Sequence, residues 1–250
     1  MKKLFATFTV IAMLAFGGVA VAQDAPEAPA EEAGGLVALH KTLKTKFIEG
    51  GAGFMALTLV TLVFGLALCI ERIIYLSLSK TNTKELLANI EAALKKGGIE
   101  EALEVCRNTR GPVASIFYQG LSRYDEGIDV VEKTVASYGG VQLGLLEKNL
   151  SWISLFISIA PSLGFLGTII GMIAAFDKIQ QVGDISATVV AGGIKVALLT
   201  TLLGLIIAIV LQLFYNYILS LIEGLVNEME DSSISLLDIV VEFDAAQKKK

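Results

Sequence analysis

Two long segments without a charged residue constrain this chain more than any other feature. No Asp, Glu, Lys, Arg or His occurs between Trp152 and Phe176 or between Val196 and Ile222. A helix needs roughly 20 apolar residues to cross a bilayer, and both segments exceed that length. A short polar span from Asp177 to Ser186 joins them. The sequence therefore predicts a membrane hairpin.

The composition favours the same class of protein. Hydrophobic residues make up 54% of the chain and charged residues only 18%, and the mean hydropathy is +0.68. Such a chain is too apolar for a soluble domain of this size. A net charge of −5, with no basic aromatic patch, argues against a nucleic-acid-binding protein. We therefore expect an all-α integral membrane protein.

Small residues recur at helical spacing in both predicted membrane helices. Lipid gives helices no hydrophobic reason to associate, so close approach of their backbones at small residues holds such helices together. Proline within a membrane helix tends to kink it and is tolerated where neighbours satisfy the freed carbonyl. The predicted packing residues are Pro161, Gly164, Gly167, Gly171, Gly193 and Gly204.

Hydroxyl groups are the polar side chains that this hairpin offers to an ion. They both donate and accept hydrogen bonds, so they can hold water or solvate a carboxylate. Because ionisable groups inside membranes usually carry proton relays, the titrating group would have to come from a partner helix. The predicted ion-path residues are Ser158, Ser162, Thr168, Thr200 and Thr201. The alternative is that the threonines only pack the helices together.

Lys195 is a candidate for the pore entrance at the outer end of the third span. Its alternative role is to extend its ammonium group to the lipid headgroups.

The rest of the chain divides into segments by composition. Residues 1–22 have a basic start, an apolar core and a small-x-small site, typical of a cleaved signal peptide; a retained first helix is the alternative. After signal removal we expect three transmembrane helices, with the N-terminus on the outer side and the C-terminus in the cytoplasm. The expected segments are an outer acidic linker and amphipathic helix (23–49), the first span (50–78), a cytoplasmic helical segment (79–149), the second span (150–176), an outer loop (177–187), the third span (188–222) and a cytoplasmic extension (223–250).

Helical spacing and Gly/Pro stops predict cytoplasmic helices over 83–96, 99–108, 113–124 and from 128 onward. The last of these is expected to continue through Glu147 into the second span, and the third-span helix to reach about Met229.

No hydrolase, zinc, phosphate-loop or dinucleotide motif occurs, and the chain has a single histidine. We therefore expect no enzyme activity, no cofactor and no metal site. The two cysteines, Cys69 and Cys106, are expected to be unpaired packing residues.

Two strings in the hairpin resemble the MotA/TolQ/ExbB family of proton-channel subunits, and its ExbB branch most closely. The first is A-P-S-L-G-F-L-G-T from Ala160 to Thr168, and the second is A-L-L-T-T-L-L-G-L from Ala197 to Leu205, followed by Tyr215-Asn216. The three-span order and the long cytoplasmic segment resemble the family as well.

The resemblance implies a homo-oligomeric ring, a pentamer, in the bacterial inner membrane, with the second and third helices lining its pore. It implies two protein partners: an ExbD-like one-span subunit, whose helix would bring the proton-carrying aspartate into the pore, and a TonB-like protein driven by the motor. It also implies contact with membrane lipids and maps the family's pore threonines to Thr168 and Thr201. One position departs from the pattern, because Val196 stands where many relatives have a glutamate.

Two other functions remain open at this point. A TolQ-like or gliding-type motor subunit would share the hairpin motif, and only its partner would differ. A non-conducting membrane scaffold would use the small residues for packing alone.

Overall fold

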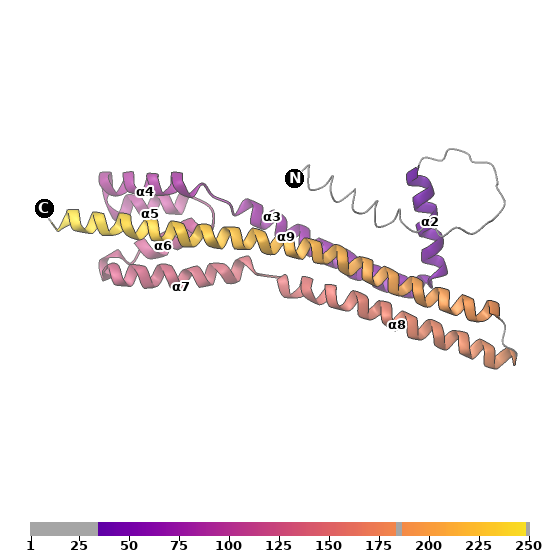
Figure 1. Ribbon diagram of the computed structural model, residues 1–250. Helices are drawn as coiled ribbons and strands as arrows, with labels where there is room; N and C mark the ends of the chain where they lie inside the picture. Colours follow the sequence, from indigo (N-terminus) through magenta and orange to yellow (C-terminus); the bar gives the residue numbers. More distant parts are fainter. Residues whose placement is uncertain (1–34, 184–186, 249–250) are drawn as a thin grey trace. The chain divides into compact units, whose positions relative to one another are not determined.

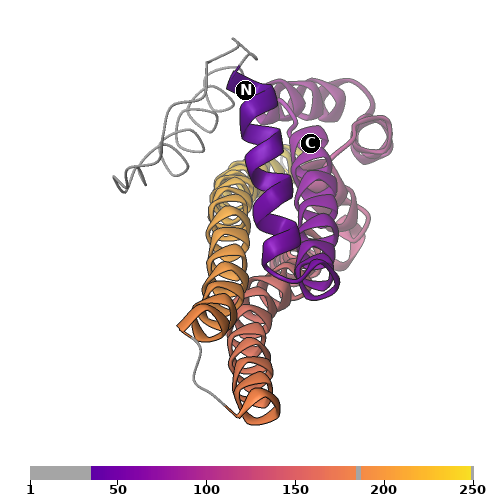
Figure 2. The same ribbon diagram turned by 90° about the vertical axis from the view of Figure 1, so that its right-hand side faces the viewer.

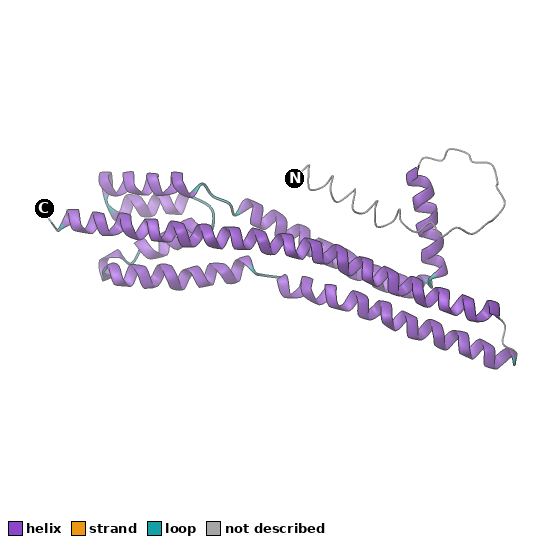
Figure 3. Ribbon diagram, viewed as in Figure 1, coloured by secondary structure: helices purple, strands orange, loops and turns teal. Residues whose placement is uncertain are grey.

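The computed structural model describes residues 35–183 and 187–248, and these ranges contain helices, turns and loops but no strand (Figure 3). The predicted signal peptide and most of the acidic linker lie outside the described residues. The chain divides into two units, Met1–Thr42 and Leu43–Lys250. The helices are α2 (Gly35–Glu49), α3 (Ala52–Leu78), α4 (Thr83–Gly97), α5 (Ile99–Asn108), α6 (Pro112–Leu121), the 3-10 helix η1 (Tyr124–Glu126), α7 (Ile128–Leu146), α8 (Leu150–Val182) and α9 (Ala187–Gln247).

Three of the described helical stretches are long and apolar enough to cross a membrane, and they contain α3, α8 and α9. The α8 and α9 helices run side by side as a hairpin and form the most extensive helix–helix contact, and α3 packs against both (Figures 1 and 2). The all-helical fold with three apolar helices confirms the predicted membrane-protein class.

The segment between α3 and α8 forms a helical layer on the second half of α9. Helices α4, α6 and α7 contact α9, and α5 joins α4 to α6 (Figure 1). Local signals explain the boundaries. The Asn82 side chain accepts a hydrogen bond from the Glu85 N–H at the start of α4, and Pro112 begins α6 where no helical N–H is required.

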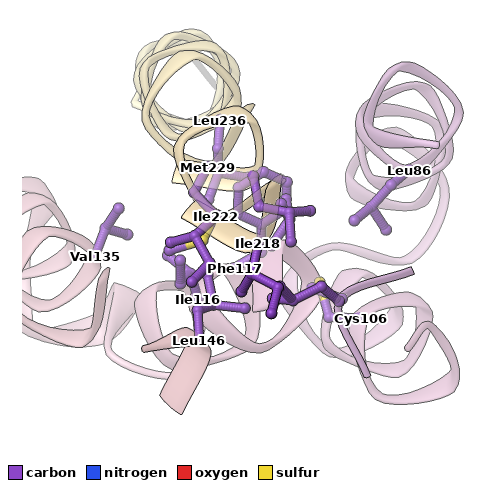
Figure 4. Packing of buried hydrophobic residues seen from close by; sticks show 14 of the residues in the cluster. Leu86, Cys106, Ile116, Phe117, Val135, Leu146, Ile218, Ile222, Met229 and Leu236 are labelled. Atoms are coloured by element: carbon purple, nitrogen blue, oxygen red, sulfur yellow. The ribbon is translucent and has the colours of Figure 1, made fainter. Parts of the chain in front are cut away.

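One hydrophobic core runs through the second unit. Phe117 of α6 is fully buried among side chains of the neighbouring helices, and Met229 and Leu236 of α9 lie close by (Figure 4). The same buried cluster contains Cys69, Ile207 and Leu211 from α3 and α9. Both cysteines are buried and free, as predicted.

The expected continuous helix from the cytoplasmic segment into the second span is wrong, because the chain breaks between α7 and α8. Asn149 has a φ of 68°, in the left-handed region. The Arg72 guanidinium of α3 lies beside this break, 3.4 Å from the Leu145 carbonyl oxygen that accepts its hydrogen bond. Arg72 also pairs with Glu71, which accepts a weak hydrogen bond from Asn149 at 3.4 Å. Polar contacts from α3 therefore stabilise the break.

Two helices are longer than the sequence predicts. The α8 helix continues past Phe176 to Val182, and α9 continues past Met229 to Gln247. The end of α9 is held by side-chain contacts: the Tyr124 hydroxyl donates to the Asp244 carboxylate at 3.2 Å, and the Tyr124 ring packs on Phe243.

Candidate functional site: the threonine-bearing hairpin

Glycines bring the α8 and α9 backbones into direct contact. A Cβ atom built on Gly204 would lie 2.5 Å from the Ala160 carbonyl oxygen, and one on Gly164 would lie 3.0 Å from the Thr200 carbonyl oxygen. A Cβ on Gly171 would lie 3.2 Å from the Ala197 nitrogen, and one on Gly193 would clash with the Ala175 Cβ. These four glycines therefore lie where the α8 and α9 backbones approach each other.

Thr168 and Thr201 meet across this glycine contact. Their hydroxyl groups form a hydrogen bond with each other. The Thr168 Oγ1 also lies 3.3 Å from the Gly164 and Ala197 carbonyl oxygens, and the Thr201 Oγ1 lies 3.2 Å from the Gly164 carbonyl oxygen. Both residues are only partly buried. The pair is therefore joined to both helices while part of it stays accessible at the edge of the hairpin.

Thr200 lies in a different environment from its neighbour. It is 1% exposed, and its hydroxyl donates to the Ala197 carbonyl oxygen at 2.8 Å. Gly167 brings it close to Phe54 of α3, because a Cβ on Gly167 would meet both side chains. This geometry favours packing between the hairpin and α3 over a place on an ion path.

Ser158 and Ser162 are exposed on α8 and bond within their own helix. The Ser158 hydroxyl donates to the Ser154 carbonyl oxygen at 3.1 Å, and the Ser162 hydroxyl donates to the Ser158 carbonyl oxygen at 2.9 Å. Helix α8 continues through Pro161 without interruption. These serines are therefore accessible from outside the hairpin, and their hydroxyls donate within α8 and not to the threonine pair.

Lys195 is tied to the end of α2 by an ion pair. Its Nζ lies 3.0 Å from the Glu49 carboxylate, which Lys46 also contacts at 3.1 Å. Hydrogen bonding to Lys195, and then to Lys46, lowers the pKa of the Glu49 carboxyl. Val196, one residue further along α9, is partly buried and lies near Gly51. The departure from the family pattern therefore places an apolar side chain against the start of α3.

The arrangement can orient a proton or a small cation but cannot itself take up and release a proton. Each hydroxyl of the threonine pair has an acceptor lone pair available beside its donor bond. No group of three or more His, Cys, Asp or Glu side chains that could hold a metal occurs in the described part of the chain.

Sequence reasoning assigned no functional role to several polar residues around the hairpin. Thr58 and Thr61 of α3 are buried and donate to carbonyl oxygens of their own helix. Arg72 is 3% exposed. Gln212 and Asn216 of α9 are exposed and hydrogen-bonded to each other at 3.1 Å. The four-residue spacing of Gln212 and Asn216 within an apolar helix is the signal that could have revealed them.

These features define a multi-pass helical membrane protein whose most extensive helix contact, between α8 and α9, carries a pair of hydroxyl groups. The family comparison gives the class a name. Residues 108–231 match the model of the MotA/TolQ/ExbB proton channel family. The chain belongs to this family, as the hairpin motifs predicted.

Individual relatives agree with this assignment. The chain is 31% identical over 169 residues to a biopolymer transport protein ExbB homolog of Methanothermobacter thermautotrophicus, covering 67% of this chain and 60% of the relative. It is 30% identical over 142 residues to the biopolymer transport protein ExbB of Neisseria gonorrhoeae, covering 57% and 62%. It is 37% identical over 73 residues to ExbB of Aquifex aeolicus, covering 29% and 49%. The chain thus spans less than two thirds of the length of these three relatives.

Proposed function

We propose that this chain is an ExbB-like proton-channel subunit of an inner-membrane motor, which uses the proton motive force to energise TonB-dependent outer-membrane transport. The observation that carries the proposal is the Thr168–Thr201 pair, held between two membrane helices that contain no ionisable side chain across their apolar parts. The names of the relatives support the transport role.

The missing acid defines the partner that the motor requires. A hydroxyl pair can solvate a carboxylate but does not titrate near neutral pH, so the proton carrier has to enter from another chain. We propose an ExbD-like one-span subunit, with an aspartate in its membrane helix, as that chain. Several copies of this protein, five in the family's ring, would surround the partner helices. A TonB-like protein would receive the motion.

We also propose an orientation of the chain in the inner membrane. The N-terminus would lie outside the inner membrane and the C-terminus inside the cytoplasm. The helical layer of α4 to α7 and the extension of α9 would then lie together on the cytoplasmic side.

The test measures proton flux into liposomes that contain the ring with its one-span partner. Thr201→Val removes the hydroxyl and keeps the side-chain shape, so we expect flux to fall by about tenfold or more, the effect of losing one hydrogen bond to a charged group. Thr201→Ser keeps the hydroxyl and should retain most of the flux. Thr168→Val should behave like Thr201→Val.

Assembly is measured on the same samples by native mass spectrometry, which also gives the number of subunits. Wild-type flux in both valine variants would refute the pathway through the threonine pair. If the wild-type complex assembles with its partner but conducts no protons, the scaffold function would replace the channel function.

A further inference from the structure

Two amide side chains lie on the exposed face of a membrane helix, where an apolar face is expected. Gln212 and Asn216 interrupt the apolar run of α9, and both are exposed in the protomer. Their depth follows from the packing, because Leu211 lies against Gly65 of α3. Gly65 is six residues from Glu71, which is about 9 Å along a helix. Gln212 therefore lies within the apolar layer, on the side toward the cytoplasm.

The amide pair shares a face of the hairpin with the threonine pair. Gln212 follows Thr201 by 11 residues, which is about 17 Å along α9 and brings its direction to within about 20° of that of Thr201. On α8, Ser154 precedes Thr168 by 14 residues and points within about 40° of it. Since Thr168 and Thr201 touch, Ser154 and Gln212 lie on the same side of the hairpin.

Ser154 and Gln212 also lie at the same level. Gly204 packs between Ala160 and Gly164 in the antiparallel hairpin. Gln212 lies eight residues after Gly204 on α9. Because the helices are antiparallel, the same level on α8 lies about eight residues before the middle of the Ala160–Gly164 helical turn, which is the position of Ser154. The hairpin therefore carries a second polar level closer to the cytoplasm than the threonine pair, with the exposed Ser158 between the two levels.

The amide groups have hydrogen-bonding capacity that the protomer leaves unused. The Gln212 Nε2 donates to the Asn216 Oδ1 at 3.1 Å. Within the described residues this is the one hydrogen bond made by either side chain, so the Gln212 carbonyl oxygen and the Asn216 amino group remain open. An open amide facing hydrocarbon costs several kcal/mol, so such groups face protein or water.

We propose that Ser154, Gln212 and Asn216 line a water-filled inner segment of the ion path, which connects the threonine pair to the cytoplasm. This inference rests on the proposed channel function and assigns the route by which a proton leaves the membrane. The Gln212 carbonyl oxygen and the Ser154 hydroxyl accept hydrogen bonds from hydrated protons or water. Asn216 continues this inner segment toward the end of the apolar layer.

Water access can be tested without measuring transport. Gln212→Cys is introduced into the full chain, and the assembled complex with its partner is treated from the cytoplasmic side with a small, charged, membrane-impermeant thiosulfonate reagent. Native Cys69 and Cys106 are 0% and 3% exposed, so the background is low. The matched control is Leu213→Cys, at the same depth but rotated by about 100°. We expect Cys at 212 to react at least tenfold faster than Cys at 213.

Flux gives the second readout. Gln212→Leu should lower proton flux about tenfold with the ring intact, whereas Gln212→Asn, which keeps an amide, should restore much of it. Leu213→Ala should leave flux close to wild type.

The outcomes separate the inference from the proposed function. Equal reactivity at 212 and 213, wild-type flux in Gln212→Leu, or loss of the ring in that variant would overturn the inner segment. In the last case the amides would be contacts between subunits. If Cys at 212 reacts selectively but the wild-type complex conducts no protons, the proposed channel function fails while the water-filled inner segment remains.

Discussion

At the scale of single residues, glycines and threonines have different roles in the hairpin. The glycines set the distance between α8 and α9, and that distance allows the Thr168 and Thr201 hydroxyls to meet. The sequence allowed both sets to be predicted, because spacing along a helix fixes which residues share a face. Helical spacing alone could not separate Thr200 from Thr201, whereas the family resemblance pointed to Thr201. Adjacent residues point about 100° apart, and only the position of α3 decides which threonine becomes buried.

Gly204→Ala should weaken the hairpin. The added methyl group would lie 2.5 Å from the Ala160 carbonyl oxygen, so the helices have to separate. We expect a loss of about 1–3 kcal/mol in the free energy of unfolding, typical of overpacking. Reversible unfolding in mixed detergent, followed by circular dichroism, measures it.

Gly224→Ala is the control on the same helix, because nothing lies within 4 Å of the Cβ position there. It should be neutral or stabilising by up to about 1 kcal/mol, from the better helix propensity of alanine. Equal stability of the two variants would contradict the close contact at Gly204.

The Cys106 thiol should be unreactive in the folded protein. Burial raises its pKa to about 12, so almost no thiolate forms at pH 8. In a Cys69→Ala background, maleimide labelling followed by mass spectrometry should be at least about a hundredfold slower at Cys106 than at an exposed cysteine introduced by Ser122→Cys.

The raised pKa of Cys106 also predicts how the free energy of unfolding changes with pH. An unfolded thiol has a pKa of about 8.5, so between that pH and about 12 the unfolded chain binds fewer protons than the folded one. The contribution of Cys106 to the free energy of unfolding should be constant below pH 8.5 and fall as the pH rises above it. Replacement by Ala should remove that part of the alkaline loss. An unchanged profile would argue against a buried thiol.

At the scale of elements, the break between α7 and α8 separates what sequence could predict from what it could not. Gly and Pro marked the ends of α4, α5 and the start of α6, because those residues act through local conformation. The break carries no such residue. The left-handed Asn149 is stabilised from outside by contacts with α3, which has no local signature in the sequence. The same holds for the end of α9, which Tyr124 holds from a distance of 120 residues.

The effect of a substitution at Asn149 on stability should depend on how readily the new residue adopts the left-handed backbone conformation. Asn149→Val forces a β-branched side chain into the left-handed region, at a cost of about 1–2 kcal/mol. Asn149→Gly should cost a few tenths of a kcal/mol, because glycine adopts this conformation freely. Hydrogen exchange of the segment 145–152 measures the local opening. Faster exchange in the glycine variant than in the valine variant would contradict a left-handed break.

At the scale of the whole molecule, one core connects the membrane helices with the helical layer beyond them. The buried cluster includes Cys69 and Leu211 as well as Phe117 and Leu236. This continuity exists because α9 passes through both regions as a single helix of 61 residues. The large hydrophobic side chains that remain exposed are concentrated on α3, α8 and α9, as a membrane environment requires.

Phe117→Ala should destabilise both regions together. The ring is fully buried, so its removal should cost about 3–5 kcal/mol of unfolding free energy. Hydrogen exchange should increase in helices α4 to α7 and also along residues 205–215 of α9. An increase confined to α4, α5 and α6 would instead indicate two independently folding regions.

The unbroken course of α9 has a mechanical consequence. Thr201 lies 46 residues before Gln247, a distance of about 69 Å along a straight helix. Pivoting such a rod by one degree about the threonine pair would displace its far end by about 1.2 Å, by simple lever geometry. A small rotation of α9 about the threonine pair would therefore move its far end by several ångströms. The hydrogen bond from Tyr124 to Asp244 lies at that end. An unbroken α9 would therefore act as a lever arm if the hairpin pivots at the threonine pair.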